Sequence, residues 1–318
     1  MAELHGRLMG CRARLLVDDG HEHLLAEAFA LGEVLEQRWS RFIPSSDIST
    51  LNRAEGRPVI VAPETLDLVE GAMNAWRTTG GWFDPGLLGS LEALGYDCTH
   101  QDLATDPAPV ARGLDAGDQL PPLSDAVGQI QVDRVLGSVS LPEGLMFDPG
   151  GIGKGMAVDL LTDHLATGGA RTSLVELGGD LRVGGVPPPG WDSWPVQIQN
   201  PLFPDTADFV VPVVDGAVCT SSRVLRRWTH NGEQHHHLLD PRTAQPSNSP
   251  VVSATVLSGV AWWADVLAKA VLVAGPEAGT RLIESLDLGA LLVEVDGTTT
   301  IAGSLRVEPA PTLSPWRL

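Results

Sequence analysis

A glycine-dense segment, Met146-Phe-Asp-Pro-Gly-Gly-Ile-Gly-Lys-Gly-Met-Ala-Val-Asp159, carries the sharpest chemical signal in the sequence. It leads from an apolar stretch into a helix expected over about residues 155–167. Backbone N–H groups in such a turn, with the helix dipole behind them, favour an anion such as a pyrophosphate, and Lys154 adds a positive charge. A tight turn without a ligand is the alternative interpretation of the same pattern.

Two common nucleotide motifs do not fit this segment. A Walker A loop needs a glycine where Asp148 stands and Ser or Thr where Gly155 follows the lysine. A Rossmann fingerprint needs alternating parallel βαβ units, which the surrounding pattern lacks. A second glycine motif, Leu177-Gly-Gly-Asp180, would let a ligand approach the backbone closely, although a plain turn explains it as well.

Three consecutive histidines, His235, His236 and His237, precede Leu238-Leu239-Asp240. If residues 236–239 form a strand, alternation places His235 and His237 on one face, so at most two of the three share a site. No HExxH motif or ligand-spaced Cys/His partner supports zinc. A neutral histidine beside a hydroxyl could instead act as a general base near neutral pH.

Asp265 and Lys269 lie four residues apart in a helix expected over residues 261–274. This spacing puts both side chains on one helix face. A simple helical ion pair is the alternative to a functional role for the two residues.

The elements that would position these motifs alternate between strands and helices. We expect helices over residues 21–39, 63–78, 155–167, 261–274 and 276–286, and a hairpin from residues 130–136 and 138–141. Further strands are expected over residues 8–17, 173–177, 181–186, 196–199, 209–214, 236–239 and 290–295, and a loop over residues 101–125. Antiparallel runs with a few helices on one side predict an α+β fold, and no short repeat period indicates a solenoid or propeller.

Composition narrows the possible partners. With 40 acidic and 21 basic residues among 318, the formal net charge of −19 disfavours nucleic acid and anionic lipid surfaces. Cys11, Cys98 and Cys219 show no CxxC spacing, which fits a reducing cytoplasm. Charged residues interrupt both the segment before Cys11 that a lipoprotein signal would need and the apolar stretch over residues 251–274. We therefore expect a soluble cytoplasmic protein of one domain, residues 1–318, that does not enter a membrane.

In their order along the chain, these motifs resemble the ApbE family of FAD-dependent FMN transferases. The landmarks span residues 9–275 and comprise Met9-Gly10-Cys11, residues 40–52, Gly81-Trp-Phe-Asp-Pro85, residues 148–159, residues 177–180, residues 237–243 and Ala264-Asp265. The resemblance implies an α+β fold of two similar halves, with mostly antiparallel sheet and FAD bound in the cleft between the halves. It also implies transfer of FMN from FAD to a Ser or Thr hydroxyl of an acceptor protein, with release of AMP.

The resemblance assigns a role to each matching residue. Phe42 would lie against FAD, and His237 would be the base that activates the acceptor hydroxyl. The other implied FAD contacts are Met9, Trp82, Phe83, Asp84, Asp148, Lys154, Asp180, His237 and Leu239.

The family's magnesium ion maps to the carbonyl of Gly151, to Asp265 and to position 269. This position usually carries Thr, whereas the present chain has Lys269, whose ammonium cannot coordinate a cation. We expect Lys269 to act in catalysis by contacting the pyrophosphate directly in part of the metal's role. Alternatively, the chain has lost transfer activity and only binds FAD. A third outcome is hydrolysis of FAD to FMN and AMP.

A smaller departure from the family is Cys11, where Thr is common. The expected acceptor is cytoplasmic.

Overall fold

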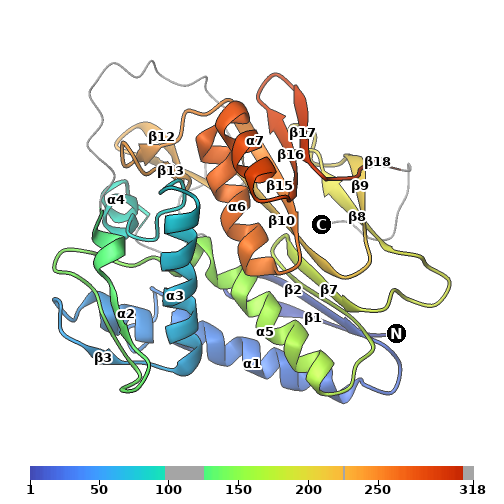
Figure 1. The fold of residues 1–318 in the computed structure, drawn as a ribbon, viewed down its shortest axis with the longest axis horizontal. Coiled ribbons are helices and arrows are strands. Elements are labelled where there is room, and N and C mark those ends of the chain that lie inside the picture. Colours follow the sequence, from blue (N-terminus) through green and yellow to red (C-terminus); the bar gives the residue numbers. More distant parts are fainter. Residues whose placement is uncertain (97–124, 225, 311–318) are drawn as a thin grey trace.

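The computed structural model describes residues 1–96, 125–224 and 226–310 and is built around an eight-stranded sheet (Figure 1). The strand order is β1-β2-β6-β7-β10-β15-β16-β17, and all neighbouring strands are antiparallel. The strands are β1 (Ala2–Leu8), β2 (Cys11–Val17), β6 (Thr172–Leu177), β7 (Asp180–Gly185), β10 (Gly216–Ser222), β15 (Val251–Ser258), β16 (Gly289–Glu294) and β17 (Thr299–Gly303). The α+β prediction is therefore confirmed.

Helices cover one face of this sheet, in front of it in Figure 1. The helix α6 (Ala261–Ala274) packs on β10 and β15, α5 (Gly153–Thr167) packs on β6 and β7, and α1 (His23–Trp39) packs on β1 and β2. Contacts between α1 and α5 and between α5 and α6 join the three helices into one layer, which α7 (Pro276–Ser285) extends. Their apolar faces form the main core with the sheet.

A second core lies on the opposite face of the sheet. There β8 (Trp194–Gln199), β9 (Ala207–Val213) and β18 (Glu308–Pro309) form a three-stranded sheet. Trp194 and Val211 from this sheet pack with Val183 and Val218 of the large one. The central strands are thus buried on both faces, and seven of the eight residues of β15 are buried, its serines and threonine included.

Smaller elements lie beside the helical layer. They are α2 (Asp47–Asn52), β3 (Val59–Ile60), α3 (Pro63–Thr78), α4 (Leu88–Ala93), η1 (Asp125–Gln129), β4 (Gln131–Asp133), β5 (Ser138–Ser140) and η2 (Pro149–Gly151). Two short hairpins complete the fold, β11 (Arg227–His230) with β12 (Glu233–His236) and β13 (Leu239–Asp240) with β14 (Gln245–Pro246).

The five predicted helices and the hairpin of β4 with β5 are confirmed. The strand predicted over residues 8–17 is confirmed as β2, but its predicted start is wrong, because β1 and β2 form a hairpin whose two-residue turn is Met9-Gly10. Both turn residues have positive φ, 51° and 71°, as a type I′ turn requires. Methionine is not a typical turn residue, and the sequence interpretation therefore did not recognise this turn.

The strand predicted over residues 236–239 is also wrong. β12 ends at His236 and β13 begins at Leu239, so His237 lies between two strands and the alternation argument does not place it. β10 and β15 were not predicted. The loop predicted over residues 101–125 lies outside the described residues, except for Asp125, which begins η1. None of the described helices combines the length and apolar character needed to cross a membrane.

Candidate active site

An open pocket lies where the start of α5, the Met9-Gly10 turn, α6 and the end of β12 meet. Of the residues predicted for the site, the pocket lining contains Met9, Phe42, Trp82, Phe83, Asp84, Asp148, Gly151, Lys154, His237, Leu239 and Lys269. Asp180 and Asp265 are absent from the lining and are only 1% and 0% exposed. They lie behind two of the lining lysines, as described below, so the structure brings the whole predicted set into one region.

Aromatic side chains form much of the pocket wall. Trp39, Phe42, Trp82, Phe83 and Tyr96 all line it. The guanidinium carbon of Arg41 lies 4.5 Å from the centre of the Phe42 ring and 4.6 Å from that of Tyr96. Such a wall suits a flat heteroaromatic ring, which can stack on aromatic faces and on a guanidinium plane.

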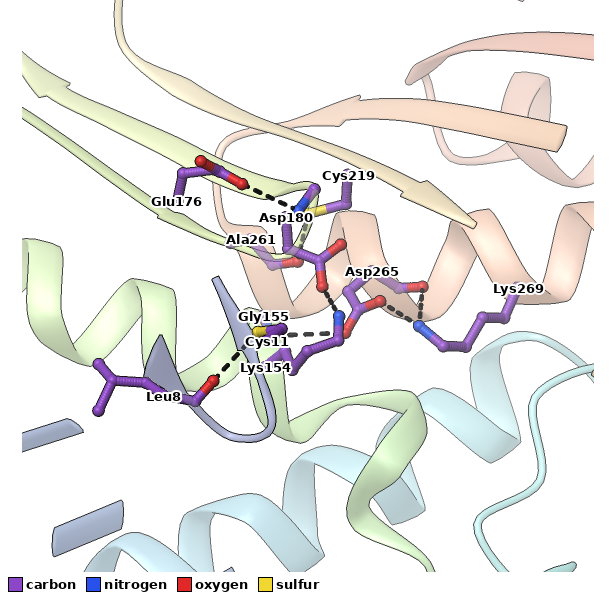
Figure 2. Close-up of polar contacts among 11 residues, drawn as sticks. Leu8, Cys11, Lys154, Gly155, Glu176, Asp180, Cys219, Ala261, Asp265 and Lys269 are labelled. Carbon is purple, nitrogen blue, oxygen red and sulfur yellow. Dashed lines mark hydrogen bonds and ion pairs between the residues drawn. The ribbon is translucent and has the colours of Figure 1, made fainter. Parts of the chain in front are cut away.

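Two lysine–aspartate ion pairs lie at the same pocket. Figure 2 shows Lys154 bonded to Asp180, which follows the Gly178-Gly179 turn, and Lys269 bonded to Asp265 one helical turn earlier on α6. Burial lowers the pKa of Lys154, and the charges of Lys269 and Arg226 lower it further against the opposing effect of Asp265. Burial would raise the pKa of Asp265, but Lys154 and Lys269 hold that pKa below its ordinary value. The four side chains therefore act electrostatically as one network.

The glycine-dense segment is held by the other motifs. The side chain of Asp148 accepts a hydrogen bond of 3.0 Å from the Gly150 N–H and so caps the turn η2. Asn52 both donates to and accepts from the backbone of Phe147, at 2.9 and 2.7 Å. The Asp148 N–H donates to the carbonyl of Pro85 at 2.7 Å. Residues 40–52 and 81–85 therefore fix the path of the segment that leads into α5.

Glycine is required at two contacts beside the ion pairs. A Cβ atom on Gly151 would lie 2.6 Å from the Phe83 ring and 3.5 Å from Cδ of Lys269. A Cβ atom on Gly178 would lie 2.8 Å from Cβ of Cys11, and φ there is 58°. Gly178 is thus needed for its close approach to Cys11, and the turn leads directly into Asp180, which is bonded to Lys154.

His237 has the properties of a base that is neutral at physiological pH. Burial lowers its pKa well below the ordinary value, the charges of Arg226, His236 and Lys269 add to this, and a hydrogen bond to the Arg226 backbone opposes it. Within the described part of the chain, its buried Nδ1 has no hydrogen-bond partner. His236 is used differently, because its Nε2 lies 3.0 Å from the Ser247 carbonyl oxygen.

The residues present do not fit a magnesium ion. Oδ1 of Asp265 is bonded to the Lys269 ammonium, and Oδ2 accepts from the Gly155 N–H at 3.3 Å. The side chain of Lys269 also lies beside Gly151, the other implied ligand. In the described ranges, no group of three or more His, Cys, Asp or Glu side chains could hold a metal ion. An ammonium therefore occupies the neighbourhood that the resemblance assigned to the cation.

The sequence interpretation missed several residues of the pocket. Arg41, Tyr96 and Arg226 line it without having been predicted. Arg41 directly precedes the predicted Phe42, and this adjacency was the only sequence signal for its place in the pocket. Arg226 comes eleven positions before His237 and is brought to it only by the hairpin of β11 and β12.

The fold and pocket define an α+β protein with a pocket whose aromatic and cationic lining suits a ligand that has a flat ring and an anionic group. Residues 9–292 match the model of the ApbE family, so the chain belongs to this family.

Named relatives agree with this assignment. The chain is 28% identical over 274 residues to a Vibrio cholerae FAD:protein FMN transferase, covering 85% of this chain and 79% of the relative. The crystal structure of the ApbE protein from Thermotoga maritima has a TM-score of 0.80 at 23% identity, over 95% of this chain and 96% of that one. The Pseudomonas stutzeri flavinyl transferase ApbE, in its apo form, has a TM-score of 0.75 at 24% identity, over 95% and 94%. These two structures support the fold.

Proposed function

We propose that this protein transfers FMN from FAD to a Ser or Thr hydroxyl of an acceptor protein and releases AMP. The observation that carries the proposal is the joint placement of a neutral histidine, a cationic cluster and an aromatic wall around one pocket. The protein's membership of the ApbE family and its likeness to the V. cholerae transferase support the same activity.

In the proposed reaction the lining residues have different roles. The aromatic side chains bind a ring of FAD, and Lys154 and Lys269 bind the diphosphate. His237 accepts the proton of the acceptor hydroxyl, for which its depressed pKa keeps it unprotonated. The hydroxyl oxygen then attacks the phosphorus of the FMN half, and AMP leaves.

We further propose that Lys269 supplies the positive charge for which related sites are expected to use magnesium. The proposal is supported by the Lys269–Asp265 ion pair beside Gly151. Direct contact between this ammonium and a diphosphate oxygen would be a charge-assisted hydrogen bond. On this basis FAD binds without a metal, and Mg²⁺ is not a required cofactor.

The decisive experiment incubates the purified protein with FAD and a candidate acceptor protein and measures the acceptor mass. We expect an increase of one FMN, and we expect it to persist after chelation of divalent ions. Strict dependence of the native protein on Mg²⁺ would contradict the role of Lys269.

The matched variant for this role is Lys269→Thr, which restores a hydroxyl ligand at this position. It should bind FAD weakly without metal and recover affinity when Mg²⁺ is added, as measured by isothermal titration calorimetry. Equal FAD affinity of the variant and the native protein in chelator would count against the ammonium–diphosphate contact.

His237→Ala tests the base. This variant should keep its affinity for FAD while transfer slows by about 10²–10⁴-fold, the usual contribution of a general base. Loss of FAD binding instead would make His237 a ligand contact.

A hydrolase that gives FMN and AMP is the second candidate, because water could replace the acceptor hydroxyl beside His237. Release of FMN at the same rate with and without acceptor would favour it. A protein that only binds FAD is the third, and the specific observation in its favour is Lys269 itself. Location in the cytoplasm, and a cytoplasmic acceptor, stay predictions; fractionation of the native host with an antibody to the protein would test them.

A further inference from the structure

The hairpin of β11 and β12 places an arginine beside His237. Its register pairs His230 with Glu233 and Arg227 with His236. One step further, beyond the last pair, Arg226 stands opposite His237. Side chains of directly opposed residues in an antiparallel pair project from the same face. Both Arg226 and His237 accordingly line the pocket.

The charges in the pocket make this arginine different from the other cations. The pocket lining contains four cationic side chains, Arg41, Lys154, Arg226 and Lys269. Lys154 and Lys269 are each bonded to a buried aspartate. Arg41 lies between two aromatic rings and 3.8 Å from carboxylate oxygens of both Glu92 and Asp148.

In the part of the chain that the structure describes, Arg226 forms no ion pair with a carboxylate. Three carboxylates, Glu36, Asp84 and Asp148, also line the pocket. Among the described lining residues, an anionic ligand therefore meets three cations that already have carboxylate partners and one, Arg226, that does not. The field of Arg226 reaches the other groups, since it lowers the pKa of both His237 and Lys154.

We propose that Arg226 binds the diphosphate of the FAD donor next to His237 and stabilises the phosphate that leaves. The inference rests on the proposed function for the transfer step. In that step the acceptor hydroxyl gives its proton to His237, and its oxygen forms a bond to the phosphorus of the FMN half. The bond from that phosphorus to the bridging oxygen breaks, and its electron pair leaves with AMP. The new negative charge then lies on the AMP phosphate, where a guanidinium can bind two oxygens at once.

The first test compares ligand binding by Arg226→Gln and the native protein. We expect about ten- to hundredfold weaker binding of FAD and ADP, the usual effect of removing a hydrogen bond to a charged group. Binding of riboflavin, which has no phosphate, should be unchanged. Arg227→Gln is the matched control, because Arg227 is the next residue, pairs with His236 and bonds Gln234. It should bind FAD like the native protein.

The second test separates binding from transfer. Arg226→Lys keeps the charge without the planar fork, and it should recover most of the FAD affinity but only part of kcat. Thermal unfolding of each variant identifies any that fail to fold, and the Lys variant then carries the comparison.

Equal loss of riboflavin and FAD binding in Arg226→Gln, or an unchanged Kd for FAD and ADP, would overturn the proposal. The flavin-transfer function would survive either result, because native transfer is measured separately. Conversely, selective loss of FAD and ADP binding with no transfer by the native protein would sustain Arg226 as the diphosphate ligand and refute only the transferase reaction.

Discussion

Asp159 caps the helix that carries Asp265 and Lys269, although it belongs to a different helix. From α5, its two carboxylate oxygens accept from the backbone N–H groups of Ala261 and Trp262, both at 2.8 Å. The residue at the N-cap position of α6, Val260, makes no side-chain cap of its own. Arg182 also donates to Asp159 at 2.8 Å. Removing this carboxylate should therefore destabilise the fold and loosen the start of α6.

The geometry sets the size of the effect. Two hydrogen bonds to a charged acceptor contribute about 1.5–3 kcal/mol each. Burial raises the pKa of Asp159, so the ionised form is less favourable in the fold than in water and part of that gain is offset. We expect Asp159→Ala to lower the free energy of unfolding by about 3 kcal/mol, since it leaves two N–H groups without a partner. Asp159→Asn should lose about 1 kcal/mol, because the amide oxygen still accepts one bond without a buried charge.

The assay is urea unfolding followed by tryptophan fluorescence. Asp163→Ala is the control, since this side chain bonds the same arginine at 3.1 Å but is 64% exposed, and such pairs contribute about 0–1 kcal/mol. Because the folded pKa of Asp159 is raised, its contribution is fully present below the unfolded pKa and is lost as pH rises. The native protein should therefore gain stability relative to Asp159→Asn as pH falls. Equal effects of Asp159→Ala and Asp163→Ala would refute the cap.

Three further variants test separate parts of the structure. Gly155→Ala would gain about 1 kcal/mol from helix propensity, but its Cβ would lie 2.6 Å from backbone atoms of Ala261 and Trp262, so we expect a net loss of about 2 kcal/mol by urea unfolding. His236 has its pKa lowered by burial to about 4, so the unfolded chain takes up the proton first. As pH falls from 6.5 to about 4, the native protein should lose up to about 3 kcal/mol relative to His236→Gln, measured as the difference between their unfolding free energies at each pH. Phe42→Ala, at a side chain 37% exposed, should leave stability unchanged but weaken FAD binding about fivefold through loss of ring stacking, as measured by fluorescence titration; unchanged affinity would remove Phe42 from the ring site.

Local signals predicted the helices well. Helix α3 begins at Pro63 and is followed by Gly80-Gly81, residue types that favour a helix start and a helix end. These local signals predicted the observed helix, Pro63–Thr78. The spacing of Asp265 and Lys269 likewise needed only a helix to bring the two together. Features set by one turn of chain are therefore available from the sequence.

Features that depend on packing between distant elements were not predicted from the sequence. β10 and β15 form the middle of the sheet, yet burial on both faces removes the alternation by which a strand is recognised. Met9 adopts a φ of 51° because the β1–β2 register requires a two-residue turn there. Arg226 gains its position from the hairpin of β11 and β12, whose Asn231-Gly232 turn is a local signal that the sequence interpretation did not use. For the two central strands, the deciding interactions therefore lie in other elements, whereas the hairpin that places Arg226 carries its own turn signal.

The glycine-dense segment shows how a correct local interpretation can still leave the chemistry open. The sequence predicts that N–H groups at the start of α5 face an anion, and in the structure the Gly155 N–H does so. The anion, however, is the carboxylate of Asp265, which is in turn bonded to Lys269. In a chain with a net charge of −19, a diphosphate is attracted most strongly where a cation has no carboxylate partner within the protein. Recognition of the ligand therefore depends less on how many cations line the pocket than on which of them remain unneutralised. That distinction depends on tertiary pairing and cannot be obtained from motif order.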